Sequence, residues 1–398
     1  MLYNRAWRIF VAAIFVATPA GAYQIGSHSR LAPLYDLHES FTAAARRCLG
    51  AGDRRPEDCS ALVEQASRAS TKHQATPANT EEYASRWADD PTRMLDRPFS
   101  QIRIGAQLAT DCRRALGSDR SIDLVGLLCS GHYGRLQFIH AQARSEDGRN
   151  MAITRRNILA WADFAYLAAT GERFRSTPFC DALPLATPDG RGLREALSFS
   201  DESFCTRRRV RVFGVSVRRY EPWTVRTLFA LQCSNPILER RCSERIDAYG
   251  DETARIAAIG ALLHLVQDSY SQSHVARVPE GERTAGPRGP FLPGVVCRAP
   301  SAYYDYQEQN LHEPNDNQEI VDDPHGAADL PPRLHESCKD PLRQVDDLVT
   351  ASAAVLFFTR PGRAPDPQGF RRYLESCVFP DAETLRRRGP HSRCFDDN

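Results

Sequence analysis

Residues 253–274 read Thr253-Ala-Arg-Ile-Ala-Ala-Ile-Gly-Ala-Leu-Leu-His264-Leu-Val-Gln-Asp268-Ser-Tyr-Ser-Gln-Ser-His274. The run before His264 is apolar, rich in alanine and helical in period, which predicts a buried helix. His264 and Asp268 stand four residues apart, so both side chains fall on one face of that helix. With His274 beyond them, this spacing suits a multinuclear zinc site. The competing interpretation is a hydrogen-bonded His–Asp pair in the core, because a buried carboxylate requires a partner.

The first residues have the pattern of an export signal. The chain starts with the charged segment Met1-Leu-Tyr-Asn-Arg5-Ala-Trp-Arg8, continues with the apolar run Ile9–Val16 and reaches Ala20-Gly-Ala22, a cleavage site of the A-x-A type. The apolar run is too short to span a bilayer, and no later segment approaches the length of a transmembrane helix. We therefore expect residues 1–22 to be a signal peptide, Tyr23 to become the N-terminus, and the mature protein to be secreted or periplasmic.

Cysteine usage agrees with export. All 12 cysteines follow the expected cleavage site, and an even number in an exported chain favours disulfides, up to six, over thiolate metal ligands. The sequence contains no C-x2-C pair. The pairing cannot be deduced from spacing alone; Cys48–Cys59 and Cys233–Cys242 are the local candidates.

Helical periodicity dominates the chain and predicts a mainly α fold. The length of the mature chain fits either one large domain with insertions or two domains, and we expect one domain over residues 23–358, with an insertion at about 172–222 and a C-terminal tail at 359–398. Thr170-Gly171 is a helix stop. Apolar spacings of three and four residues predict helices over Ala32–Ala51, Glu57–Ser70, Ser100–Leu116, Ile153–Thr170, Trp223–Gln232, Glu239–Ser271 and Pro341–Phe358. The segments Phe179–Phe204, Pro279–Pro300 and Thr359–Asn398 are rich in Pro, Gly and Arg, which predicts loops or tail.

One segment, Arg207–Tyr220, departs from the helical pattern. It alternates valine with polar residues on both sides of Gly214, which predicts a short β-hairpin with an arginine-rich face. That face is either solvated or contacts phosphates or lipid headgroups in a transient membrane-surface contact. The formal net charge of the chain is only +1, so a membrane or nucleic-acid partner would have to be held by such a local patch.

Further candidate metal ligands lie in separate segments. Trp87-Ala-Asp89-Asp90-Pro91 ends a helical stretch with two carboxylates, and an ordinary helix end is the competing interpretation. His140 lies on an apolar helical face, where a lone histidine is more often a core residue than a ligand.

A second His-x3-Asp is formed by His325 and Asp329, after Asp323 and Pro324, which favour the start of a short helix. Its rival, His312/Asp316, has the same spacing but carries Pro314 between the partners.

The expected mature N-terminus offers one more metal site. The α-amino nitrogen and carbonyl oxygen of Tyr23 can chelate a metal in a five-membered ring, and His28 can add a third donor. This chemistry requires cleavage after Ala22.

Taken in order, these features resemble the superfamily of bacterial zinc-dependent phospholipases C and fungal single-strand-specific zinc nucleases. The resemblance spans Tyr23 to Asp329 and is most specific at His264, Asp268 and His274. It implies a mostly helical fold with about three zinc ions in a cleft. The zinc ligands that it implies are Asp89, His140, His264 and Asp268 for the first ion, Asp268, His28 and Tyr23 for the second, and His274, His325 and Asp329 for the third, with Asp90 as an alternative to Asp89. Asp89 and Asp268 are then the catalytic carboxylates, and the ligand set is N/O only, as in catalytic zinc sites.

Such a centre suits hydrolysis of phosphodiesters by an activated water without a separate nucleophile. The chain contains no G-x-S-x-G, H-E-x-x-H or G-x4-G-K-[ST] motif, so serine hydrolase, zincin and P-loop functions lack support. Phospholipase C acting on phosphatidylcholine-like lipids is the first expectation. A single-strand nuclease or nucleotidase, with Tyr303, Tyr304 or Trp223 stacking on a base, is the alternative. A disulfide-braced binding protein without activity is the third.

Overall fold

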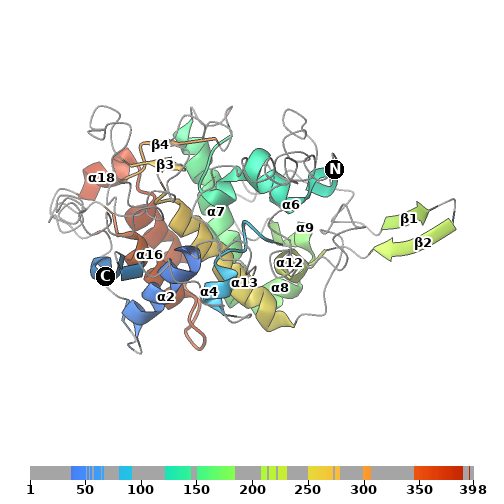
Figure 1. The fold of residues 1–398 in the computed structure, drawn as a ribbon, viewed down its shortest axis with the longest axis horizontal. Helices are drawn as coiled ribbons and strands as arrows, with labels where there is room; N and C mark the ends of the chain where they lie inside the picture. Colours follow the sequence, from blue (N-terminus) through green and yellow to red (C-terminus); the bar gives the residue numbers. More distant parts are fainter. Residues whose placement is uncertain are drawn as a thin grey trace, which may run out of the picture.

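The computed structural model describes residues 37–50, 52, 54–55, 58–63, 65–66, 80–91, 122–144, 150–183, 208–212, 215–220, 223–230, 250–271, 274–277, 299–305, 345–388 and 394. These residues are mostly helical, which confirms the mainly α expectation. Figure 1 shows the helices assembled around α13, with a two-stranded hairpin at one end of the molecule.

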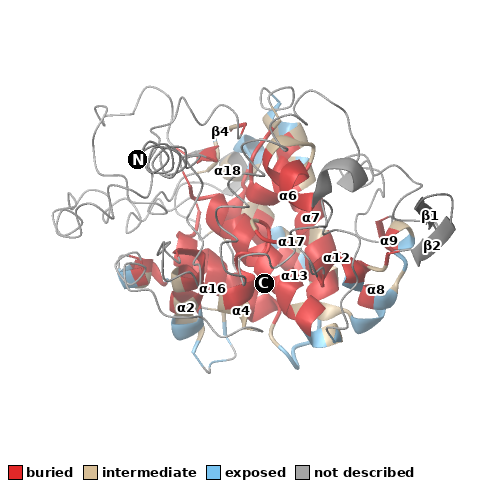
Figure 2. Cartoon of the chain, turned by 45° about the vertical axis from the view of Figure 1, so that its right-hand side comes forward, coloured by how far each residue is buried: buried red, intermediate tan, exposed pale blue. Residues whose placement is uncertain are grey.

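Helix α13 (Asp251–Asp268) is the centre of the core and packs against α2 (Leu37–Leu49), α4 (Glu81–Ala84), α7 (Met151–Thr170) and α16 (Leu348–Phe358). A helix enclosed by neighbours must be apolar on every face, which explains its alanine-rich sequence. In Figure 2 the helices around it are coloured as buried over most of their length.

The start of α13 corrects one prediction. Gly250, with φ −62° and ψ 169°, is its N-cap, so the helix begins at Asp251 and not at Glu239. Periodicity does not register such a boundary, because a glycine inside a helical pattern is tolerated at modest cost. Residues 239–249 lie outside the described part of the chain.

Gly260 lets α4 approach the middle of α13 very closely. A Cβ added there would lie 2.0 Å from the carbonyl oxygen of Ala84. Any residue with a side chain would therefore clash with the backbone of α4, and glycine, which has no Cβ, does not. The end of α4 and the turn that follows it are therefore held directly against α13, one helical turn before His264.

Several predicted helices are present with adjusted ends. Helix α7 ends at Thr170 as expected and is capped at its start by the Asn150 side chain, which accepts a hydrogen bond from Ile153 N–H. Helix α16 begins at Leu348, because Asp347 caps it by accepting from the N–H groups of Val349 and Thr350. Of Glu57–Ser70, the described part contains the 3₁₀ helix η1 (Ser60–Leu62), and Ser100–Leu116 lies outside the described residues.

The remaining helices are short or were not expected. They are α6 (Ile122–Tyr133), η4 (Gln137–His140), α8 (Glu172–Ser176), α9 (Phe179–Ala182), α12 (Val225–Phe229), α17 (Pro367–Tyr373), the π-helix η9 (Leu374–Val378) and α18 (Ala382–Arg388). The expectation of a loop or tail is wrong at α9 and over most of residues 367–388. Phe370 and Tyr373, on α17, are fully buried, so this C-terminal segment completes the core.

The expected β-hairpin is formed by β1 (Arg208–Val212) and β2 (Val215–Tyr220), which pair antiparallel with Arg209 opposite Arg219. A second pair, β3 (Val275–Ala276) and β4 (Ala302–Tyr303), lies next to the candidate site.

Two disulfides lie within the described residues, Cys48–Cys59 and Cys377–Cys394. The first is one of the two expected local pairs, and the other, Cys233–Cys242, lies outside the described residues. None of the helices that the structure describes is long and apolar enough to cross a membrane.

Candidate metal centre

The last turn of α13 carries the central pair. His264 and Asp268 are fully buried, and His264 Nε2 lies 2.9 Å from Asp268 Oδ2. The carboxylate therefore ends the core helix at the point where η4, α4 and α2 converge on it.

Asp89 and His140 join this pair from two other segments. Asp89 Oδ2 lies 3.8 Å from His264 Nε2, and Asp89 Oδ1 lies 3.9 Å from His140 Nδ1. His140 Nδ1 is 2.9 Å from Asp268 Oδ2 and 3.0 Å from His264 Nε2. The structure thus brings together the four residues that the resemblance assigns to one zinc ion, with Asp89 within 3.9 Å of both histidines.

Local structure explains how Asp89 reaches the site. Thr80 caps the single turn of α4, and the chain then turns through residues 85–89. Trp87 anchors this turn by stacking on Trp161, with ring centroids 5.9 Å apart, and by packing against Phe229. The carboxylate that follows Trp87 is therefore held by an aromatic contact in the core and by the close approach of α4 to Gly260.

His274 lies against the same carboxylate. It is 1% exposed, donates its Nδ1–H to the carbonyl oxygen of His140 at 2.7 Å, and lies 3.5 Å from Asp268 Oδ2. The backbone contact from Tyr304 N–H to His274 O, which extends the β3–β4 pairing, fixes its position. Four of the expected site residues, Tyr23, His28, His325 and Asp329, lie outside the described part of the chain, as does the rival pair His312/Asp316.

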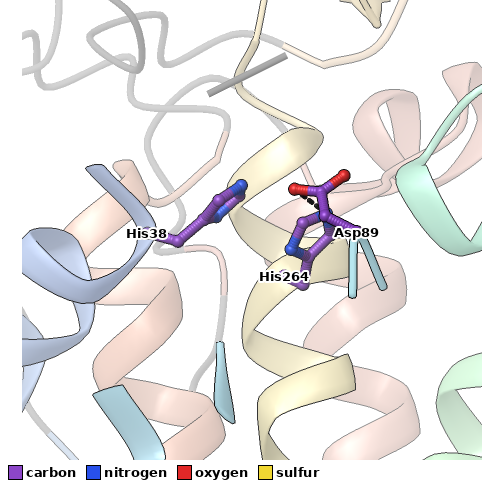
Figure 3. Close-up of side chains that lie close together, drawn as sticks. All are labelled: His38, Asp89 and His264. Carbon is purple, nitrogen blue, oxygen red and sulfur yellow. Dashed lines mark ion pairs between the residues drawn. The ribbon is translucent and has the colours of Figure 1, made fainter. Parts of the chain in front are cut away.

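Two histidines in the cluster were not among the expected site residues. His38, on α2, has its Nε2 3.6 Å from Asp268 Oδ1 and its ring stacked on that of His264, with centroids 4.1 Å apart. Figure 3 shows His38 and Asp89 on either side of His264. His132, at the end of α6, has its Nε2 3.2 Å from Asp89 Oδ1. A signal was present for His38, since it shares the buried face of an amphipathic helix with Leu37 and Phe41.

The ring nitrogens show a common pattern. Four histidines direct Nδ1 at an oxygen acceptor: His264 at Ser85 O (2.8 Å), His132 at Leu128 O (2.8 Å), His274 at His140 O (2.7 Å) and His38 at Gln267 Oε1 (2.7 Å). Because an oxygen of this kind only accepts, each Nδ1 carries the hydrogen. A neutral imidazole then has its lone pair on Nε2. This arrangement is typical of metal-binding histidines, whose second nitrogen is fixed by a carbonyl or carboxylate.

The carboxylates are ionised and most of the imidazoles are neutral. Burial lowers the pKa of His38 to about 4 and that of His140 to about 3. Burial opposes ionisation of Asp268 and Asp89, but the neighbouring histidines outweigh it and hold the pKa of both carboxyls below the usual value. Burial also lowers the pKa of His264, yet the charges of Asp268 and Asp89 raise it to about 9.

The buried polar atoms of the cluster that lack a hydrogen-bond partner within the structure as described include Asp268 Oδ1, His140 Nε2 and His274 Nε2. Buried polar atoms are normally satisfied, so each requires an explanation. A divalent cation bound by carboxylate oxygens and imidazole nitrogens is one explanation that the donor set fits. Three overlapping groups have ligand atoms within 4.8 Å of one another: His38/Asp89/His264, Asp89/His132/His140 and His140/His264/Asp268.

A fourth group with suitable spacing does not fit a metal. It contains Asp346, Cys377 and Cys394, but the two cysteines form a disulfide and Arg55 lies 3.3 Å from the carboxylate.

Comparison of the chain with family models, with curated proteins and with solved structures found no match. The geometry of the cluster is therefore the basis for assigning a function.

Proposed function

We propose that the protein is an exported phosphodiesterase with a multinuclear zinc centre of about three ions, built around Asp268. The observation that carries this proposal is the set of histidines whose Nδ1 hydrogens are committed to oxygen acceptors around two ionised, poorly accessible carboxylates. A core that needed only a hydrogen-bonded pair would leave no reason to collect five histidines there.

The residues have separable roles in this proposal. Asp268 has a fully buried side chain, so it serves to hold the cations, whereas the side chain of Asp89 is 14% exposed and is the carboxylate that a substrate can approach. When bound, zinc would lower the pKa of water and neutralise charge on the phosphoryl oxygens. Asp89 would then both ligate zinc and accept a hydrogen bond from the attacking water, while His264 and His140, fixed by their own hydrogen bonds, would keep a constant arrangement of charge around it.

Phospholipase C remains the first choice of activity, and the arginine-rich hairpin β1–β2 is the feature that supports contact with a phosphate-bearing surface. The nuclease alternative needs aromatic side chains to stack on bases. Of the three aromatic residues considered for that role, Tyr303 is 3% and Trp223 is 6% exposed, so these two belong to the core, and Tyr304 is the one left at intermediate exposure.

Zinc content and activity measured on the exported, cleaved protein test the proposal. We expect about three zinc ions per chain, loss of activity with a chelator and its recovery with zinc. Assays on phosphatidylcholine and on single-stranded DNA separate the two enzymatic alternatives. A folded protein with no more than stray zinc would contradict the proposal and favour a binding or structural role.

The third zinc ion can be tested in the segment that the structure does not describe. Replacing His325 with alanine should remove one zinc ion and most of the activity, whereas His312→Ala should have little effect, because Pro314 interrupts the helix that the rival pair would need. The opposite result would exchange the two assignments.

A further inference from the structure

Gln267 lies between His264 and Asp268 in the sequence, and its side chain contacts the neighbouring helices α2 and α16. Its Nε2 donates to Thr42 Oγ1 on α2 at 2.9 Å and to Ser352 Oγ on α16 at 3.4 Å. Its Oε1 lies 2.7 Å from His38 Nδ1. Gln267, Thr42, Ser352 and His38 are all fully buried, so the amide is enclosed where three helices meet.

The orientation of this amide determines the tautomer of His38. With both Nε2 hydrogens directed at hydroxyl oxygens, Oε1 is the end of the amide that faces His38, and it can only accept. His38 therefore carries its hydrogen on Nδ1, and its Nε2 presents a lone pair to Asp268 Oδ1, 3.6 Å away. Two electron-rich atoms face each other across this gap, and Asp268 Oδ1 has no hydrogen-bond partner among the described residues.

The two oxygens of Asp268 consequently face different partners. Oδ2 faces His264 and His140, each at 2.9 Å, whereas Oδ1 faces His38. Stacking of the His38 ring on His264 at 4.1 Å holds the ring plane, and Gln267 holds its tautomer.

We infer that Gln267 is a positioning residue for metal binding: it keeps His38 in the Nδ1–H tautomer, so that His38 Nε2 and Asp268 Oδ1 together hold a cation distinct from the one beside His264 and His140. This inference rests on the proposed zinc centre and adds to it a ligand, His38, and the residue that orients that ligand. Residues that orient a metal-binding histidine typically contribute 10–100-fold to affinity.

The experiment uses the full mature chain, stripped of metal and then titrated with zinc against a chromogenic chelator. Gln267→Met keeps the length of the side chain but removes the amide acceptor, so one zinc ion should bind about 10–100-fold more weakly. Gln267→Glu keeps an acceptor for Nδ1–H and should stay within about threefold of wild type. The matched control is Ser352→Ala, which removes a contact of Gln267 but leaves the one to His38, and it should also stay within about threefold.

Imidazole nitrogen NMR of the metal-free wild type provides a readout that does not depend on any variant folding. His38 should show the Nδ1–H tautomer in the wild type and in Gln267→Glu, and a mixture of tautomers in Gln267→Met. A wild-type His38 protonated on Nε2 would overturn the inference, as would a Gln267→Met protein with unchanged zinc affinities. Equal losses in Gln267→Met and Ser352→Ala would also overturn it, because they would indicate a packing effect of α16.

The inference and the proposed function can fail separately. If the wild type binds no zinc, the proposed function fails whatever the tautomer of His38. If the wild type binds zinc and Gln267→Met binds it equally well, the zinc centre stands and only the role of Gln267 is lost.

Discussion

Two of the buried carboxylates, Asp346 and Asp268, differ in the groups that surround them. Asp346 accepts from Tyr373 OH at 2.7 Å and from Arg55 Nη1 at 3.3 Å, and both of these groups are donors whatever the pH in the neutral range. Asp268 is surrounded by imidazoles, and its Oδ1 has no donor among the residues described. Both carboxylates are nearly inaccessible to solvent. Asp346 is therefore satisfied by donors, whereas Asp268 Oδ1 faces His38 Nε2, the ring nitrogen without a hydrogen, and a cation between these two atoms would complete the arrangement.

The surroundings of the two carboxylates agree with this difference. The Asp346 cluster also orders the backbone, since Asp346 O accepts from Tyr270 OH at 2.6 Å and Asp346 N–H donates to Cys377 O at 2.9 Å. It therefore joins the C-terminal helices to the end of α13. The Asp268 cluster instead joins separate segments through histidine and aspartate side chains, which are of the types that can bind a metal.

The largest expected effect comes from removing the charge of each carboxylate in turn. Asp268→Asn should lower zinc affinity by more than about 100-fold and should abolish activity. This loss exceeds the 10–100-fold that typically follows from removing a residue that only orients a metal ligand. Asp346→Asn should leave zinc content unchanged but destabilise the protein by about 3–5 kcal/mol, because Arg55 loses its buried partner. Elemental analysis and thermal unfolding of both variants provide the measurements. If Asp346→Asn lost zinc instead, the distinction between the two carboxylates would not hold.

The next effect concerns the N-terminus, which we expect to supply a chelate to an ion on Asp268. A protein that keeps an initiating Met before Tyr23 has an amide in place of the α-amino group. It should bind one zinc ion fewer and lose much of its activity while still folding. Equal zinc content in this protein and in exported, cleaved material would leave Tyr23 outside the site.

A smaller effect is expected from the packing of α4 on α13. In Gly260→Ala the new Cβ would meet Ala84 O at 2.0 Å, so α4 must move, at a cost of about 1–3 kcal/mol. Ser85 and Asp89 follow α4, so zinc affinity should fall as well. Gly52→Ala is the control, since a Cβ at Gly52 meets no atom within 4 Å, and its stability should change by less than about 0.5 kcal/mol. Unchanged zinc affinity in Gly260→Ala would mean that α4 does not position Asp89.

The smallest expected effect is a change with pH in the number of protons that the protein releases when it binds zinc. The metal-free protein holds a proton on His264 at neutral pH, because the pKa of this histidine is raised to about 9, whereas the lowered pKa of His38, about 4, leaves that ring neutral. Zinc binding through His264 Nε2 must displace this proton. In the protein that keeps an initiating Met before Tyr23, which has no α-amino group to bind zinc there, the proton release measured by titration calorimetry in two buffers should therefore fall by about one proton per chain between about pH 7.5 and pH 10. Constant release over this range would indicate that His264 is not a ligand.

The same pKa shifts of His264 and His38 predict how the stability of the metal-free protein depends on pH. A raised pKa in the folded state means that His264 stabilises the fold fully below its unfolded pKa of about 6.5, and that this contribution is lost as the pH rises through about 9. His38 acts in the opposite direction, since its lowered pKa favours unfolding as the pH falls from about 6.5 through about 4.

The sequence by itself determined the features that depend on local spacing. The alanine-rich run and the four-residue spacing of His264 and Asp268 predicted a buried helix with both side chains at one place, and the structure has them in the last turn of α13. The stop at Thr170, the hairpin around Gly214 and the Cys48–Cys59 disulfide are likewise set by residues close together in the chain. Such features have a period, a turn or a short loop that the sequence displays directly.

Only the tertiary structure decided which distant residues complete the site. His38 and Gln267 are separated by 229 residues and share no motif, yet they form one hydrogen bond that fixes a tautomer. The C-terminal segment looked like a tail because its Pro, Gly and Arg content resembles that of a loop, but Phe370 and Tyr373 fill the core. The physical reason is that packing and hydrogen-bond partners are chosen by position in space, and a spacing pattern contains no information about contacts between separate helices.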